Sequence, residues 1–371
     1  MQTILSTNTS KLIKNKEGQV MQIFLNILLL VLGIVVVIYG GDIFVNASIR
    51  IGQKLKIPHI IIGATIVSLA TTLPEFIVST ISASQGAYGL AVGNSIGSVI
   101  CNTALICGLS LAIVPSVVKE KGIMKYLILL VAVIMLFLFS INKNVSVAES
   151  IVLFASFIVF IAINVVEAVK KTKQEQEIKI KSNDDQKINI EKKNDQDKNN
   201  DSKQETEEEL KPQNIWFTVL LFIIGAGMIA GGAWSMVQGS TFLCSAIGIS
   251  DALIGLTVCA VGTSLPELIT TITAIKKKTA SLGYGNIIGA NILNITLITS
   301  CCGFIAGKNG LTLTNQNFII DFPIAILVSI LFVLPLIFKN KTYRWQGVTL
   351  LSIYAVYIIG SILLEVLKVQ I

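Results

Sequence analysis

The sequence predicts an all-α polytopic membrane protein with ten transmembrane helices, arranged as two inverted five-helix repeats. Three observations lead to this fold class. The 371 residues are 53% hydrophobic with a mean hydropathy of +0.75, which is more apolar surface than a soluble domain can bury. Apolar stretches of about 20 residues recur along the chain, each long enough to cross a bilayer core as a helix. Two of these stretches also repeat each other in sequence at a fixed offset of 192 residues.

The chain divides into four parts. A polar N-terminal tail covers 1–21, the first five-helix repeat 22–166, a charged loop 167–212 and the second five-helix repeat 213–371. The loop is rich in charged and amide residues and has no aromatic residue, so we expect it to be disordered, a solvated tether. The predicted spans are 22–45, 57–83, 87–114, 126–142, 148–166, 214–238, 249–275, 280–305, 317–338 and 347–367.

Basic residues report the orientation of the spans. Four loops on one side carry basic clusters, whereas the opposite short loops hold only Lys143 and Lys308. The positive-inside rule places the clusters and the central loop in the cytoplasm and both termini outside the cell membrane, although three lysines in the N-terminal tail argue against this. The net charge of +7 therefore reflects topology and not a nucleic-acid partner. The clusters are Arg50, Lys54 and Lys56; Lys119, Lys121 and Lys125; Lys276, Lys277 and Lys278; and Lys339, Lys341 and Arg344.

The two halves are predicted to be inverted copies. Each half has five spans, and because five is odd, the second half enters the membrane from the opposite side. The segments that repeat are Gly63–Asn102 and Gly255–Asn294, in which 14 of 40 positions are identical without a gap. Inverted repeats built around interrupted apolar helices are typical of secondary transporters, with the substrate site near the midplane between the halves.

Each copy carries one glutamate well inside an apolar span, Glu75 and Glu267. A charged side chain at the bilayer centre costs about 2.5–3.5 kcal/mol, and no lysine or arginine lies within the predicted spans to offset that cost. We therefore expect a cation or a proton from solution to be the partner. The alternative, a protonated glutamate kept for packing, is less favoured because the residue recurs at the same motif position.

The other acidic residues lie less centrally in their spans, and Asp42 among them is interpreted as structural. Asp42 lies on the first span, but Trp234 occupies the same offset in the second half, so Asp42 has no acidic counterpart. The others fall near predicted span ends, where we expect the interface to hydrate them; they are Glu149, Asp251, Asp321 and Glu365.

Both glutamates follow a proline. Pro74 has no amide proton to donate to the carbonyl four residues earlier, and Pro266 is placed identically, so each helix opens one turn before its glutamate. Freed backbone carbonyls, including those of Thr71 and Thr263, are tolerable at membrane depth only where they line a cavity or hold an ion. Hydroxyl residues three or four positions before each glutamate share its helix face. They are Thr71, Thr72, Thr263 and Ser264.

The next span of each copy carries a polar stripe at i, i+4 spacing. The stripe is Asn94, Ser98 and Asn102 in the first copy and Asn286, Ala290 and Asn294 in the second. Two glutamates, amide oxygens and backbone carbonyls supply about six to eight hard oxygens, the number that Ca²⁺ takes. The stripes contain no histidine or cysteine, which disfavours zinc and copper. For each asparagine taken alone, an interhelical hydrogen bond is the structural alternative.

These two segments closely resemble the alpha repeats of the sodium/calcium exchanger family, prokaryotic type, within the calcium/cation antiporter superfamily. The resemblance rests on Gly-Thr-Ser-Leu-Pro-Glu at 262–267 and Gly-Ser-x-x-x-Asn at 97–102, and it covers essentially the whole chain. It implies a secondary antiporter, not an enzyme, that exchanges Na⁺ for Ca²⁺ by alternating access. Ca²⁺ and Na⁺ are then transported ions, and no permanently bound cofactor is expected.

The resemblance also implies roles for individual residues. Glu75 and Glu267 ligate Ca²⁺ and Na⁺ in turn, and the residues matching Asn102 and Asn294 complete the central site. Thr71 and Thr263 contribute backbone oxygens. The hydroxyls in the sodium sites are those of Thr72, Ser264 and Ser98.

The chain departs from the family pattern at three places. The first repeat has Ala70-Thr71-Thr72 where the family often has Gly-Thr-Ser, and Thr72 keeps the hydroxyl of that serine. Ala290 stands where a serine is usual, so the sodium stoichiometry stays open. Asn294 stands where potassium-dependent members have aspartate, so potassium co-transport is disfavoured.

Several alternatives stay open at this point. A proton/calcium (or other cation) exchanger would use the same glutamates, although proton-coupled relatives usually carry a Gly-Asn-x-x-Glu motif. An intramembrane enzyme with the two glutamates as acid and base, a primary pump and a passive channel are all less favoured. Selectivity among divalent ions, direction of transport and oligomeric state, a monomer included, are not determined by the sequence.

Overall fold

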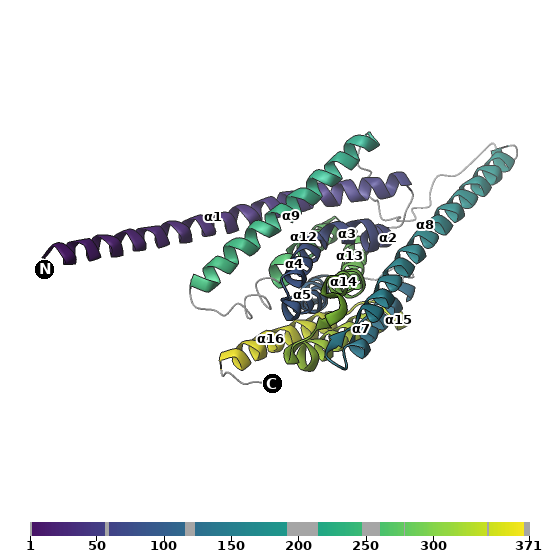
Figure 1. The fold of residues 1–371 in the computed structure, drawn as a ribbon. Coiled ribbons are helices and arrows are strands. Elements are labelled where there is room, and N and C mark those ends of the chain that lie inside the picture. Colours follow the sequence, from purple (N-terminus) through teal and green to yellow (C-terminus); the bar gives the residue numbers. More distant parts are fainter. Residues whose placement is uncertain are drawn as a thin grey trace.

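The computed structural model describes residues 2–55, 59–115, 123–190, 214–246, 260–277, 279–339 and 341–366. Within these ranges it is helical apart from one short β-ladder (Figure 1). The first half contains α1 (Gln2–Leu55), α2 (His59–Ile62), η1 (Gly63–Val67), α3 (Ser68–Thr71), α4 (Leu73–Ser84), α5 (Tyr88–Ile100), η2 (Cys101–Cys107), α6 (Gly108–Ile113), α7 (Ile123–Phe139), β1 (Asn144–Val145) and α8 (Val147–Ile190). The second half contains α9 (Ile215–Ala246), α11 (Ala260–Thr263), α12 (Leu265–Lys276), α13 (Ala280–Leu293), η4 (Asn294–Ile298), α14 (Thr299–Ala306), η5 (Gly307–Asn309), β2 (Leu311–Thr312), η6 (Asn317–Asp321), α15 (Phe322–Lys339) and α16 (Arg344–Val366).

Seven described helical segments are long and apolar enough to cross a membrane. Each falls on a predicted span, so the all-helical multi-pass membrane fold is confirmed. They are Val20–Leu55, Tyr88–Ile113, Val147–Glu167, Ile215–Gly232, Ala280–Asn309, Asn317–Lys339 and Arg344–Leu364.

The three other predicted spans are occupied by less regular helices. The second span is a pair of helical segments, Gly63–Thr71 and Leu73–Ser84, bent by 52° at the break between them. The fourth is α7, which is apolar but shorter than the seven. Of the seventh, 249–275, residues 249–259 lie outside the described residues and the remainder forms α11 and α12. The number of ten spans and the inversion of the halves stay predictions.

Two helices extend past the expected boundaries. α1 begins at Gln2, within the tail expected at 1–21, and α8 continues to Ile190, within the loop expected to be disordered from residue 167. Lysine, glutamate and glutamine favour helix, and Glu175 and Glu177 each precede a lysine at i+4 spacing. Residues 167–190 are polar and contain no proline, so they continue α8 beyond its apolar part. The rest of that loop, 191–213, lies outside the described residues.

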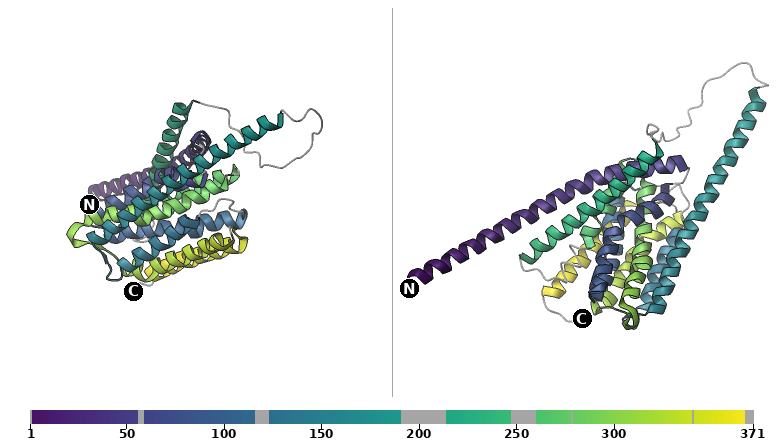
Figure 2. Two further views of the ribbon diagram at one scale, coloured as in Figure 1. Left: turned by 90° about the vertical axis from the view of Figure 1, so that its right-hand side faces the viewer. Right: turned by 45° about the horizontal axis from the view of Figure 1, so that its top comes forward.

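The helices form layers (Figures 1 and 2). α1 and α9 lie side by side on one face of the bundle, and α7, α15 and α16 lie on the opposite face, with the repeated segments between them. The buried fraction follows these layers. Of the 18-residue apolar window in each span, 78% is buried in Tyr88–Ile113 and 83% in Ala280–Asn309, but only 11% in Val20–Leu55. The two segments that carry the asparagine stripes are therefore the centre of the protein.

Glycines allow the central helices to approach closely. A Cβ atom on Gly63 would lie 2.3 Å from the carbonyl oxygen of Leu282, and one on Gly289 would lie 2.6 Å from that of Ala64. Such contacts are possible only without a side chain, as in the small-residue interfaces of membrane helices. Gly63 and Gly289 therefore allow the repeated segments of the two halves to lie in direct backbone contact.

A small antiparallel ladder joins the two halves at one end, which an all-α expectation did not include. β1 pairs with β2 in the register Asn144 to Thr312 and Val145 to Leu311. Gly310, at φ 70°, lies against the Asn144 side chain, where a Cβ would be 2.1 Å from Oδ1. Val145 and Leu311 are both completely buried, so the ladder closes the bundle at this end.

Candidate functional site: a buried carboxylate and amide cluster

Two equivalent helix breaks position the glutamates. α3 ends at Thr71 and α4 begins at Leu73, while Thr72 between them has φ −82° and ψ 3°. Ser264, between α11 and α12, has φ −84° and ψ 3°. In each case a proline occupies the first turn of the new helix, where its missing amide proton is tolerated. The Leu-Pro-Glu sequence therefore produces the same local geometry in both halves and places each glutamate in a first turn.

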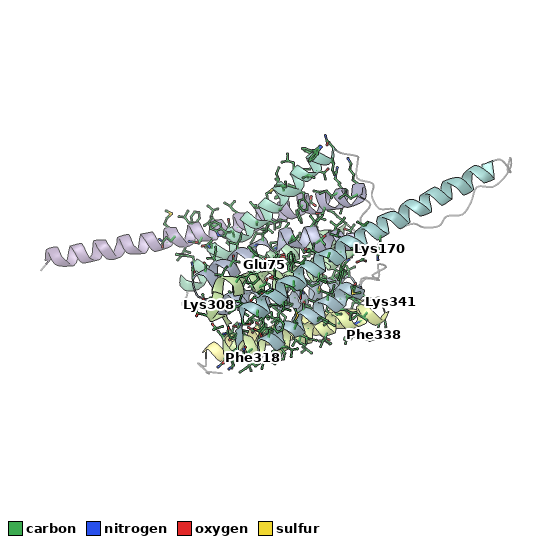
Figure 3. The ribbon with its side chains drawn as sticks, turned by 45° about the vertical axis from the view of Figure 1, so that its right-hand side comes forward. Glu75, Lys170, Lys308, Phe318, Phe338 and Lys341 are labelled. Carbon is green, nitrogen blue, oxygen red and sulfur yellow. The ribbon has the colours of Figure 1, made fainter. Side chains whose placement is uncertain are left out.

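Both glutamates are completely buried. Figure 3 places Glu75 among the central helices, between the end of the bundle that carries Lys308 and the end that carries Lys341. The Ser264 hydroxyl donates a hydrogen bond to Glu75 Oε1 at 3.3 Å, so the first carboxylate is contacted by the motif of the second half. Glu75 and Glu267 are also close enough to interact electrostatically. Two like charges so close and so buried require a compensating positive charge or proton.

The polar stripes face this pair from the next span of each half. Asn94 donates to Ser79 Oγ at 2.9 Å and, more weakly, to the Glu75 carbonyl at 3.4 Å. Asn286 donates to Thr270 Oγ1 at 2.9 Å and accepts from Thr71 Oγ1 at 3.1 Å. Each of these asparagines therefore braces its stripe against the glutamate helix of its own half, and Asn286 also contacts α3 of the opposite half.

Both stripes end in a π-helix. η2 begins at Cys101, one residue before Asn102, and η4 begins at Asn294 itself. A π-helical turn widens the helix and changes the direction in which side chains project, and such turns recur at functional sites. This feature was not predicted, because each turn contains one asparagine and one threonine among apolar residues, a composition that is not specific to a π-helix.

Many buried polar atoms around the glutamates have no hydrogen-bond partner. Nearly all of them are acceptors, the atoms that a cation requires, and an unpaired buried acceptor costs about 1–3 kcal/mol or more when it is charged. They are Glu75 Oε2, both carboxylate oxygens of Glu267, the Oδ1 atoms of Asn94, Asn102 and Asn294, and Ser98 Oγ. Asn294 Nδ2 and Thr271 Oγ1 are also without partners there.

The structure brings all nine sequence-predicted ligands into the buried centre, but their hydroxyls differ in availability. Ser98 Oγ has no hydrogen-bond partner, whereas the Ser264 hydroxyl donates to Glu75. The Thr72 hydroxyl bonds to the Ser68 carbonyl of its own helix, and Thr263 Oγ1 lies 3.4 Å from the Ala260 carbonyl. The Thr72 and Thr263 hydroxyls therefore lie against carbonyls of their own helices, whereas the Thr71 hydroxyl donates to Asn286. The backbone oxygens expected from Thr71 and Thr263 stay a prediction.

Two further acidic residues behave differently from each other. Asp42 is largely exposed and pairs with Lys277 at 2.9 Å, in agreement with its structural interpretation. The expectation that water hydrates Asp321 was wrong, because this residue is completely buried. Asn317 Nδ2 donates to its carboxylate at 2.9 Å and Tyr357 Oη at 3.0 Å. The i, i+4 spacing of Asn317 and Asp321 was the one local signal for this arrangement.

The sequence analysis also missed three polar residues that cross between the halves. Asn291 accepts from Asn102 at 3.1 Å and donates to Thr103 at 2.8 Å. Ser95 donates to the Asn294 carbonyl at 2.5 Å. Local sequence carries little signal for these contacts, because Ser95 and Asn291 are matched by Ile287 and Val99 at the 192-residue offset.

Comparison with known proteins gives a consistent result. A family model described as sodium/calcium exchanger protein matches residues 25–166 and again 217–363, one match in each half. An uncharacterized membrane protein of Methanocaldococcus jannaschii is 31% identical over 88% of this chain and 95% of its own length. The sodium/calcium exchanger MaX1 of Methanosarcina acetivorans is 29% identical over 91% of this chain and 98% of its own length.

A solved structure has the same fold and a related sequence. It is that of the sodium-calcium exchanger NCX_Mj soaked with Na⁺ and Ca²⁺, which superposes with a TM-score of 0.71. The two chains are 29% identical, and the alignment covers 90% of this chain and 97% of the other.

Proposed function

The chain belongs to the sodium/calcium exchanger family, and we propose that it is a secondary antiporter that exchanges Na⁺ for Ca²⁺ at a paired-glutamate site. The observation that carries the proposal is the set of buried acceptor oxygens without partners, contributed by both halves. No lysine or arginine among the described residues pairs with Glu75 or Glu267. The compensating charge is therefore the transported ion.

The charge of the site explains why two cargoes compete for it. Two carboxylates neutralise one Ca²⁺, and the free oxygens of Glu75, Glu267, Asn102 and Asn294 provide hard ligands of the kind that Ca²⁺ prefers. Sodium ions occupying the same oxygens exclude Ca²⁺, so the two ions travel in opposite half-cycles. The Ser264 hydroxyl, which donates to Glu75 in the described structure, turns its lone pairs to an ion when one is bound.

The two departures from the family pattern bear on stoichiometry. Ala290 is completely buried and offers no oxygen where Ser98 does in the first half, so we propose that one sodium position is weakened. Asn294 presents an uncharged amide, which gives the site two carboxylates and not three. This disfavours the extra charge of potassium co-transport.

The membrane arrangement is part of the same proposal. Ten spans in two inverted halves would present the site alternately to each side, with both termini outside and the central loop cytoplasmic. The separation of Lys341 and Lys170 at one end of the bundle from Lys308 at the other supports this orientation (Figure 3). Labelling of a cysteine introduced at Lys308 by an impermeant reagent in intact cells tests it, with Lys341→Cys as the matched position that must stay unlabelled.

The decisive experiment is radiocalcium uptake into proteoliposomes containing the purified protein. An outward Na⁺ gradient is expected to drive uptake, and potassium and proton gradients imposed in its place are expected to have no effect. Glu75→Gln and Glu267→Gln are expected to abolish the flux. Sodium-driven uptake that survives Glu75→Gln unchanged would overturn the proposal.

Proton/calcium exchange is the second candidate, and one observation favours it. Glu267 has no hydrogen-bond donor at either carboxylate oxygen, and a proton is the smallest group that can neutralise it. Uptake driven by a proton gradient in sodium-free buffer would select this candidate over the first.

A further inference from the structure

Two hydrogen bonds connect the ligand asparagines to the opposite halves of the protein. Asn102 of the first half bonds to Asn291 of the second, and Asn294 of the second half bonds to Ser95 of the first. Neither Ser95 nor Asn291 belongs to the repeated motif, because the residues at the matching positions, Ile287 and Val99, are apolar. The two contacts are therefore not copies of one another.

Asn291 determines the direction of the Asn102 amide. Asn102 Nδ2 donates to Asn291 Oδ1 at 3.1 Å, and Asn291 Nδ2 donates in turn to Thr103 Oγ1 at 2.8 Å. Because an amide is planar, fixing its nitrogen also fixes its oxygen. The Asn102 oxygen is left buried and without a partner, as an ion ligand must be.

Ser95 acts on the backbone of the other asparagine. Its hydroxyl donates to the Asn294 carbonyl at 2.5 Å, where Thr299 Oγ1 also donates at 3.0 Å. Asn294 is the first residue of the π-helix η4, so these bonds hold the turn from which its side chain projects. Both amide atoms of Asn294 remain unpaired.

From this geometry we infer that Asn291 and Ser95 are positioning residues, each orienting the ligand asparagine of the opposite half. The inference rests on the proposed function, since it assigns them to that ion site. Neither residue touches the ion. Supporting groups of this kind fix ligand direction, and their loss typically costs about 10–100-fold in metal affinity.

The test measures Ca²⁺ affinity directly, by titration calorimetry of the purified full-length protein with Ca²⁺ alone. Asn291→Val, which introduces the residue found at the matching position 99, is expected to weaken binding about ten-fold. Ser95→Ala is expected to weaken it about three-fold, because Thr299 still holds the carbonyl. Thr103→Val is also expected to weaken Ca²⁺ binding, whereas Thr103→Ser, which keeps the hydroxyl, is expected to retain the wild-type affinity.

Two controls separate positioning from general destabilisation. Asn164 is a completely buried asparagine on α8 whose amide donates to its own helix, so Asn164→Val removes a similar hydrogen bond outside the site and is expected to leave affinity unchanged. In a double-mutant cycle, Asn291→Val is expected to have no further effect once Asn102→Ala is present. A merely structural role predicts additive losses.

The outcomes distinguish the inference from the proposed function. If the wild-type protein and Asn102→Ala bind Ca²⁺ equally, the proposed site is wrong. If Asn102→Ala weakens binding but Asn291→Val and Ser95→Ala do not, or if the losses of Asn291→Val and Asn102→Ala are additive, the site stands and the positioning role is overturned.

Discussion

The glutamates of the two halves share a backbone but not an environment. The breaks before Glu75 and Glu267 have the same dihedral angles within a few degrees. Glu75 nevertheless accepts a hydrogen bond from the opposite half at one oxygen, whereas Glu267 has none at either. The repeated Leu-Pro-Glu sequence therefore specifies where the carboxylates lie, and positions at which the two copies differ, such as Ser264 and its counterpart Thr72, determine how each is satisfied.

The asparagine stripes differ in the same way. In the first stripe, the Ser98 hydroxyl has no hydrogen-bond partner and the Asn102 amide is held by Asn291. In the second stripe, Ala290 has no hydroxyl and neither amide atom of Asn294 has a partner. In the proposed ion site, the side chains of the first half are therefore held more firmly than those of the second.

Loss of either carboxylate is expected to have the largest effect and to test this asymmetry. Removing one partner of a buried charge pair costs about 3–5 kcal/mol, more than 100-fold in Ca²⁺ affinity. We expect Glu267→Gln to lower the Ca²⁺ affinity more than Glu75→Gln, because the Glu75 carboxylate already accepts a hydrogen bond from Ser264 at one oxygen. Calorimetric Ca²⁺ binding measures both, and equal losses would show that the hydrogen bond from Ser264 makes no difference.

Restoring the helix at each break comes next in size. Pro74→Ala and Pro266→Ala supply an amide proton that can close the break, and we expect each to lower sodium-driven Ca²⁺ flux about ten-fold. Because the two breaks have the same geometry, the two losses should agree. A large difference between the two flux losses would mean that the two breaks have the same backbone geometry but contribute unequally to transport. Leu73→Ala, beside the break on an exposed position, is the control.

Exchanging the serine and alanine of the stripes is expected to have a moderate effect. Ala290→Ser adds an oxygen in the second half and Ser98→Ala removes one from the first, each worth about 1 kcal/mol or five-fold in Na⁺ affinity, with opposite signs. The Na⁺ dependence of Ca²⁺ efflux and its Hill coefficient measure the change. An unchanged Hill coefficient in both variants would contradict a sodium position at this stripe.

The smallest effect is expected at Asp42, an acidic residue present in one half only. Its ion pair with Lys277 is partly exposed, with side-chain exposures of 58% and 29%, and such pairs contribute about 0–1 kcal/mol. Asp42→Asn should shift the thermal midpoint by less than about 3 °C and leave transport unchanged. Impaired transport in this variant would extend the functional asymmetry beyond the stripes.

The sequence predicted those parts of the site that depend on local chemistry. Proline placement predicted both helix breaks. The residues of the i, i+4 stripes are buried, as are most residues of α5 and α13, so their role as ligands stays a prediction. The continuation of α8 past residue 167 was not expected, because the low hydropathy of that loop predicted disorder, although lysine and glutamate are good helix formers.

The missed residues depend on contacts between distant segments. Asn291 meets Asn102 across 189 positions, and Ser95 meets Asn294 across 199. Asp321 lies at a nominal span end, where a hydropathy pattern predicts solvent, but Tyr357 of α16 covers it from a position 36 residues away. The π-helices add to this difficulty, since their shift in side-chain direction has no signature in these turns.

The ladder between β1 and β2 has a consequence for how the protein is assembled. Asn144 must remain unpaired while the chain up to Thr312 is synthesised, because its partner lies 168 residues downstream. Contacts of such long sequence separation form late, after the intervening segments have reached their places. Pairing of Val145 with Leu311 therefore requires that the two halves have already met in the correct register.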